Sequence, residues 1–150
     1  MYKKILVPLD GSELSETILP QAVSVAKPSK AEIVLLRVHE PLEPAVRETL
    51  GGDLAEKLDT VNREEMENYL AKIARDLDGQ GLKVSVVTVF GRPADTIIEY
   101  TGANAIDLIA MATHGRSGIT KWAFGSVADK VLRLSPVPVL VGPVAGATRA

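Results

Sequence analysis

Glycine and hydroxyl residues gather in one stretch, between residues 112 and 127, in an order that is typical of a phosphate-binding loop. An apolar run, 108–112, precedes Gly115, Gly118 and the pair Gly125 and Ser126. From residue 127 apolar side chains recur every three or four positions, which indicates a helix. A glycine loop ahead of a helix brings backbone N–H groups close to an anion. The stretch therefore predicts a phosphate site, beside which Arg116 either pairs with the anion or lies in solvent.

The chain lacks the residue patterns of the common catalytic sites. It has no cysteine, which excludes disulfides, thiolate metal sites and thiol nucleophiles. It has no Walker lysine motif and no serine–histidine pairing, and His114 lacks the second histidine of a nucleotidyl-transfer signature. Binding is therefore expected rather than turnover, with at most slow hydrolysis.

Two histidines, His39 and His114, are the only ones in the chain. Both are expected at the carboxyl ends of strands, with backbones about 10 Å apart. A joint metal site would need a third ligand, and the sequence offers none nearby. We therefore expect no protein-bound metal; a divalent ion would enter with phosphates.

Length and charge narrow the function classes. The chain has 150 residues, which fits one domain, and a formal net charge of −2. This balance gives no basis for a nucleic-acid or membrane partner. No apolar run approaches the roughly 20 residues that cross a bilayer, and no signal peptide precedes the first predicted strand. We expect a cytoplasmic protein.

Apolar runs and helix-period stretches alternate along the chain. Predicted strands cover 3–9, 32–38, 82–90, 108–112 and 135–141. Predicted helices cover 12–26, 54–77, 93–101 and 126–134, and a flexible excursion is expected over 39–52. In the long helix one apolar face is expected to contain Leu54, Leu58, Val61, Met66, Leu70, Ile73 and Leu77. Strict alternation predicts a parallel sheet with helices on both faces.

Prolines mark where these elements bend or end. Pro20 falls inside the first helix, where it should kink it, and Pro93 fits the first position of a helix. Pro136 and Pro138 cannot donate to a ladder, so the last strand is expected at a sheet edge.

Polar turns follow several of the predicted strands. The first strand ends in Asp10-Gly-Ser12, in which Ser12 is a good helix N-cap, and the second ends at Val38 and His39. Ligands of doubly wound sheets bind beyond the carboxyl ends of the strands. These turns and the glycine loop are therefore expected at one shared edge.

These motifs carry a family resemblance. Residues 5–12, residues 91–94 and the late glycine loop are similar to those of the universal stress protein family, over nearly the whole chain. The nucleotide-binding subgroup of that family has a glycine, two residues, a glycine, nine residues and then Gly-Ser or Gly-Thr. Gly115, Gly125 and Ser126 match this pattern, whereas Ala112 stands at the first glycine position. Alanine adds only a methyl group there.

The resemblance implies a fold, a ligand and an assembly. The fold is a Rossmann-like, adenine nucleotide alpha-hydrolase-like three-layer α/β sandwich over residues 1–142, with strand order 3-2-1-4-5 and a loose tail over 143–150. The ligand is ATP, with Mg²⁺ or Mn²⁺ carried by its phosphates. The assembly is a homodimer through residues 137–141, and the function is a stress response through an unknown regulatory partner. The implied site residues are Pro8, Leu9, Asp10, Val38, Met111, Ala112, His114, Gly115, Arg116, Gly118, Gly125, Ser126 and Val127.

Each implied role has a structural alternative. Asp10 either contacts adenosine or shapes the Gly11 bend as an Asx turn. Ser126 and the N–H of Val127 contact phosphate, or Gly125 and Ser126 form only a tight turn and a helix N-cap, which Asp129 completes as a capping-box-like pattern. Because of Ala112, a nucleotide-free dimeric interaction or protective module remains the alternative function, and an enzyme of the same fold is a third.

Overall fold

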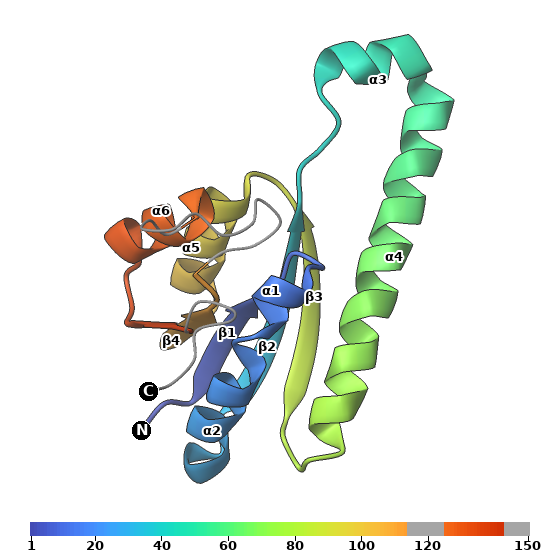
Figure 1. The fold of residues 1–150 in the computed structure, drawn as a ribbon. Helices are drawn as coiled ribbons and strands as arrows, with labels where there is room; N and C mark the ends of the chain where they lie inside the picture. The colour runs from blue at the N-terminus through green and yellow to red at the C-terminus, as the bar shows by residue number, and fades with distance from the viewer. Residues whose placement is uncertain (114–124, 143–150) are drawn as a thin grey trace.

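Five apolar segments form one parallel sheet in the order β3-β2-β1-β4-β5 (Figure 1). The structure is a computed structural model that describes residues 1–113 and 125–142. The strands are β1 (Lys4–Pro8), β2 (Glu32–His39), β3 (Val84–Phe90), β4 (Leu108–Met111) and β5 (Val139–Val141). The predicted α/β class and strand order are thereby confirmed. Gly115, Arg116, Gly118, His114 and the tail over 143–150 lie outside the described residues.

Six helices connect these strands in the described part of the chain. They are α1 (Glu13–Glu16), α2 (Leu19–Ser29), α3 (Pro44–Leu50), α4 (Gly52–Asp78), α5 (Pro93–Ala103) and α6 (Ser126–Leu134). In residues 1–113 and 125–142 no helix is both long enough and apolar enough to cross a bilayer.

The sheet is buried on both faces, which explains why its central strands are almost purely apolar. In β1, Ile5 and Val7 pack toward α2 and α4, whereas Leu6 packs toward α5 and α6. All three side chains are fully buried. Leu6 lies between Val34 of β2 and Ile109 of β4 in the sheet register, so β1 forms the centre of the core.

The predicted kink at Pro20 is wrong. Instead of kinking one helix, the proline lies in the first turn of α2, and α1 has already ended at Glu16. A first-turn N–H has no partner within the helix, so proline loses nothing there. Pro93 begins α5 as predicted.

The expected flexible excursion over 39–52 contains a helix. Pro44 starts α3 in the same way that Pro93 starts α5, and Gly51, with φ +84°, separates α3 from α4. The sequence interpretation gave the proline and glycine content too much weight, because both residues lie at the ends of the helix.

The last strand is shorter than predicted. It begins at Val139, after Pro136 and Pro138, because a proline has no N–H to donate to the ladder, although the Pro138 carbonyl still accepts from the Ile109 N–H at 3.1 Å. Ser135 and Val137 close a local turn instead, in which the Val137 N–H donates to Ser135 Oγ at 3.2 Å. Within residues 1–113 and 125–142 the strand pairs with β4 alone, as an edge strand should.

Only half of the predicted apolar face of α4 meets the core. Met66, Leu70, Ile73 and Leu77 are buried, but Leu54, Leu58 and Val61 are 50%, 37% and 49% exposed. A helix of 27 residues is about 40 Å long, whereas the seven residues of β3 span about 23 Å. The first turns of α4 therefore project past the sheet (Figure 1).

Candidate functional site

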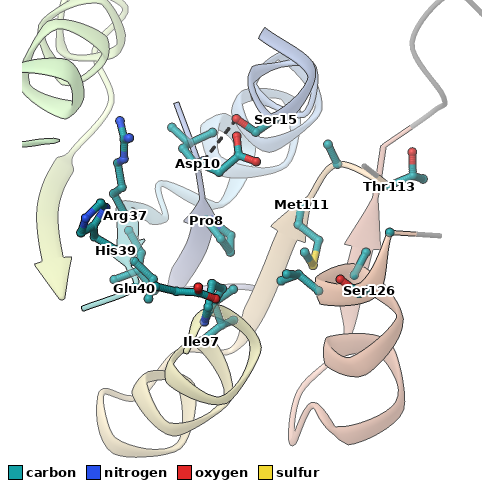
Figure 2. A pocket seen from close by; sticks show the side chains of 18 residues that line it. Pro8, Asp10, Ser15, Arg37, His39, Glu40, Ile97, Met111, Thr113 and Ser126 are labelled. Carbon is teal, nitrogen blue, oxygen red and sulfur yellow. Dashed lines mark hydrogen bonds between the residues drawn. The ribbon is translucent and has the colours of Figure 1, made fainter. Parts of the chain in front are cut away.

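A cleft of about 500 Å³ opens beyond the carboxyl ends of β1, β2 and β4. Its walls include the first turns of α5 and α6 and Ser15 of α1 (Figure 2). Strand order reverses around β1, so this is the position at which open α/β sheets bind ligands. Its volume falls in the range of small-molecule sites.

Nine of the implied site residues line this cleft. They are Pro8, Leu9, Asp10, Val38, Met111, Ala112, Gly125, Ser126 and Val127. They come from four separate segments of the chain, which the parallel sheet brings to one edge.

On the β1 side of the cleft, a hydrogen-bonded turn holds Asp10. Oδ1 of Asp10 accepts from the backbone N–H of Ser12 at 2.9 Å and from the Ser12 hydroxyl. Ser12 Oγ also accepts from the N–H of Ser15 at 3.2 Å, so Ser12 caps α1 as predicted. Gly11 allows the bend with φ +88°. The Asx-turn interpretation of Asp10 is thus confirmed, and the turn presents the carboxylate at the cleft (Figure 2).

On the α6 side, the helix starts without a side-chain cap. Gly125 is the N-cap and Ser126 the first helical residue, so the predicted capping role of Ser126 is wrong by one position. Asp129 does not complete a capping box but pairs with Arg133 at 3.0 Å. Because glycine offers no side chain, N–H groups of the first turn remain for an acceptor in the cleft.

One backbone bond holds this helix start beside β4. The N–H of Gly125 donates to the carbonyl of Thr113 at 2.9 Å. Ala112, at the first glycine position of the motif, is only 8% exposed and lines the same wall. Its methyl group is therefore accommodated largely within the protein.

Several lining residues were not among the predicted site residues. They are Ser15, Leu36, Arg37, His39, Glu40, Pro93, Ile97, Thr113 and Ala128. Because Val38 was expected at the end of a strand, its sequence neighbours Arg37, His39 and Glu40 could have been predicted as lining residues too. Pro93 and Ile97 required the packing of α5 on β2, which the sequence did not show.

Arg37 joins the Asp10 turn to α4. Its guanidinium carbon lies 5.2 Å from the centroid of the Tyr69 ring, a cation–π contact. It also lies so close to Gly11 that a Cβ there would come within 2.7 Å of Nη1. Tyr69 in turn donates to Glu16 Oε2 at 2.9 Å, and burial together with this bond raises the pKa of Tyr69.

His39 takes part in side-chain packing at the end of β2. Its ring meets Phe90 edge to face at 5.4 Å, and Nε2 lies 3.4 Å from Nδ2 of Asn62 on α4. Among residues 1–113 and 125–142, no three potential ligands gather as a metal site would require.

An ion pair joins α5 to α6. Lys130 Nζ lies 2.6 Å from Oδ1 of Asp95. The hydrogen bond and charge of Lys130 lower the pKa of the Asp95 carboxyl. The pair spans the two helices whose first turns line the cleft.

Comparisons with known proteins agree with this fold. Residues 1–143 match the model of the universal stress protein family. The universal stress protein MJ0531 of Methanocaldococcus jannaschii is 33% identical over 141 residues, which cover 94% of this chain and 82% of that protein.

Solved structures give the same result. The hypothetical protein MJ0577 superposes with a TM-score of 0.84 at 31% identity, over 98% of this chain and 99% of its own. A universal stress protein in complex with cAMP superposes with a TM-score of 0.69 at 22% identity, over 93% and 95% of the two chains. The family match covers all five strands, and the chain belongs to the universal stress protein family.

Proposed function

We propose that this protein binds an adenine nucleotide, ATP, in the cleft and acts in the cytoplasm by nucleotide-dependent regulation of a partner, with at most slow hydrolysis. One observation carries the proposal: the Asp10 turn and the uncapped start of α6 lie across the same cleft. A carboxylate can accept from ribose hydroxyls, and a helix N-terminus favours phosphate. The cAMP complex of a relative supports the class of ligand.

In this proposal the nucleotide lies across the cleft from β2 to α6. The adenosine contacts Pro8, Leu9, Asp10 and Val38. The phosphates contact Ser126 and the N–H of Val127, together with the loop that contains Gly115, Arg116 and Gly118. Mg²⁺ or Mn²⁺ enters on the phosphates, since such ions need few protein ligands when bound in this way.

Calorimetric titration with ATP tests this assignment. The double variant Gly125→Val and Ser126→Ala crowds the phosphate position and removes its hydroxyl, so ATP affinity should fall at least about tenfold, or about 1.4 kcal/mol. Ser29→Ala, a hydroxyl deletion at the end of α2 far along the chain from the cleft motifs, is the matched control and should keep the wild-type affinity. Unchanged affinity in the double variant contradicts the site.

A second function rests on Ala112, whose mostly buried methyl group replaces the first glycine of the motif. On this alternative the protein is a nucleotide-free module that acts through its dimer surface. Chromatography of the supernatant from freshly purified, denatured protein separates the two. Released adenine nucleotide supports the first function; none released, with no binding of millimolar ATP, supports the second.

We also propose a homodimer through residues 137–141. The support is that, among the residues that the structure describes, β5 pairs with β4 alone, which leaves one row of its backbone groups for a second copy. Analytical ultracentrifugation tests it: a mass near 32 kDa, twice the 16.0 kDa of one chain, is expected, and a monomer overturns it.

A further inference from the structure

Two helices form an arm that projects beyond the sheet. We define the arm as residues 44–61, that is, α3 and the first turns of α4 (Figure 1). Arg47 of α3 and Asp59 of α4 form an ion pair at 2.6 Å, and Ala55, fully buried, lies within the arm. The arm is therefore a braced pair of helices and not a loose loop.

The arm presents an apolar stripe to solvent. Leu54, Leu58 and Val61 are spaced four and three residues apart, so they share one face of α4. Four of the seven large hydrophobic side chains that the described residues expose belong to the arm, the fourth being Val46. Apolar side chains gathered on one face are typical of an interaction site, whereas single ones are not.

The surroundings of this stripe are acidic. Residues 40–65 contain eight acidic and three basic residues, a net charge of −5, although the whole chain carries only −2. Glu65 continues the stripe one turn further along α4, and Asp53 and Glu64 border it; all three are exposed. On the described part of α4, Lys57, three residues after Leu54 and four before Val61, is the basic residue that borders it.

The negative charge around the stripe indicates which kind of molecule can bind there. A second copy of this chain would bring the net charge of −5 of its own residues 40–65 against the same charge here, and phosphate-rich surfaces such as nucleic acid or anionic membrane are repelled in the same way. A positively charged segment with one apolar face complements both the stripe and its border. An amphipathic helix offers this combination in the helix-in-groove mode of recognition.

We propose that the arm docks a basic amphipathic helix of a partner protein, with its apolar face on Leu54, Leu58 and Val61 and its lysines or arginines toward Asp53, Glu64 and Glu65. The site does not depend on the proposed nucleotide. The rest of α4 packs on β3 and β2, at the opposite end of the strand order from β5, so docking on the projecting arm is compatible with the proposed dimer.

Fluorescence anisotropy tests the proposal with a defined probe and no nucleotide present. The probe is a labelled 18-residue peptide of leucine and lysine with helical period, and an isomeric design of leucine and glutamate is the control peptide. We expect the lysine peptide to bind with a micromolar Kd at physiological salt and the glutamate peptide to bind at least tenfold more weakly. No binding of the lysine peptide at 100 μM, or equal binding of both, overturns the proposal.

Two sets of variants separate the apolar and ionic parts. The triple variant combines Leu54→Ala, Leu58→Ala and Val61→Ala, which keep the helix propensity of α4. Its affinity for the lysine peptide should fall at least tenfold. The affinity of the double variant Glu64→Gln with Glu65→Gln should fall by at least as much. Leu134→Ala, at an exposed leucine on α6, is the matched control. Equal affinity in the triple variant and this control overturns the proposal. So does sedimentation in which wild-type oligomers disappear in the triple variant, because the stripe then binds a second copy.

Discussion

The two walls of the cleft are built in opposite ways. On the β1 side, Asp10, Ser12 and Ser15 satisfy one another in a turn that requires a left-handed glycine. On the α6 side, Gly125 leaves the first helical turn uncapped. A wall that satisfies its own hydrogen bonds is rigid before any ligand arrives, whereas an uncapped helix start offers its donors to the ligand. Substitutions in the first wall should therefore affect stability, and those in the second should affect binding.

The largest effect on stability is expected at Gly11. Gly11→Ala places a side chain at φ +88° and pushes against Arg37, so the free energy of unfolding should fall by about 1–2 kcal/mol. Gly125→Ala, at φ −58° on the opposite wall, should cost only roughly 0.5 kcal/mol. Urea denaturation of both variants measures the difference, and equal losses would remove the contrast between the walls.

A substitution at Ser126 is expected to raise the stability of the protein and to lower its affinity for ATP. Ser126→Asp puts a carboxylate in the first turn of α6, which should stabilise the helix by about 0.3–1 kcal/mol. The same charge repels phosphates, so ATP affinity should fall about tenfold, or about 1.4 kcal/mol. Thermal denaturation and calorimetry check the two effects. Ser126→Ala, which removes the hydroxyl without adding a charge, separates the loss of the hydroxyl contact from the repulsion. An aspartate variant that binds ATP like wild type contradicts the phosphate position.

A smaller effect is expected from Ser12→Ala. It removes the cap of α1 and one of the hydrogen bonds to Asp10, which should lower the free energy of unfolding by about 1 kcal/mol. Ser29→Ala, which removes hydroxyl bonds in the last turn of α2, should stay within about 0.5 kcal/mol. Chemical denaturation compares the two. A Ser12 variant as stable as the Ser29 variant indicates that the turn is held without its hydroxyl.

The smallest effect is expected for Asp95, whose carboxyl pKa is lowered by Lys130. A lowered pKa in the folded state stabilises the protein above the ordinary value, near 3.9, and this contribution disappears as the pH falls through the folded-state pKa. Asp95→Asn should therefore lower Tm slightly at pH 7, whereas at strongly acidic pH the variant and the wild type should have the same Tm. Lys130→Gln should show the same loss at pH 7, with no further loss in the double variant. A pH-independent Tm difference contradicts the ion pair.

Local features of both walls could be predicted from the sequence. The Ser12 cap depends on residues within three positions of one another, and so does the Asx turn of Asp10. The position of Pro93 at the start of a helix could be predicted because the N–H that proline lacks has no partner in a first helical turn. The glycine pattern indicated Gly125 and Ser126 as part of the site, but it assigned the cap to Ser126, because glycine and serine are both good N-cap residues.

Contributions from distant segments could not be predicted in the same way. Leu36 and Ile97 line the cleft because α5 packs on β2, and Arg37 lies beside Gly11 through the pairing of β1 with β2. Residues more than 20 positions apart in the chain leave no local pattern that states their proximity. The family resemblance supplied the strand order, and the structure confirmed it.

By itself, the sequence determined the α/β alternation, the Ser12 cap of α1 and the residues that form the cleft motif, because each depends on local backbone chemistry. The tertiary structure alone decided which part of the apolar face of α4 meets the core. The same periodicity runs along all of α4, yet Leu70 is buried and Leu54 is half exposed. The reason is geometric: the helix is longer than the strand it packs beside, and its first turns have no sheet to cover.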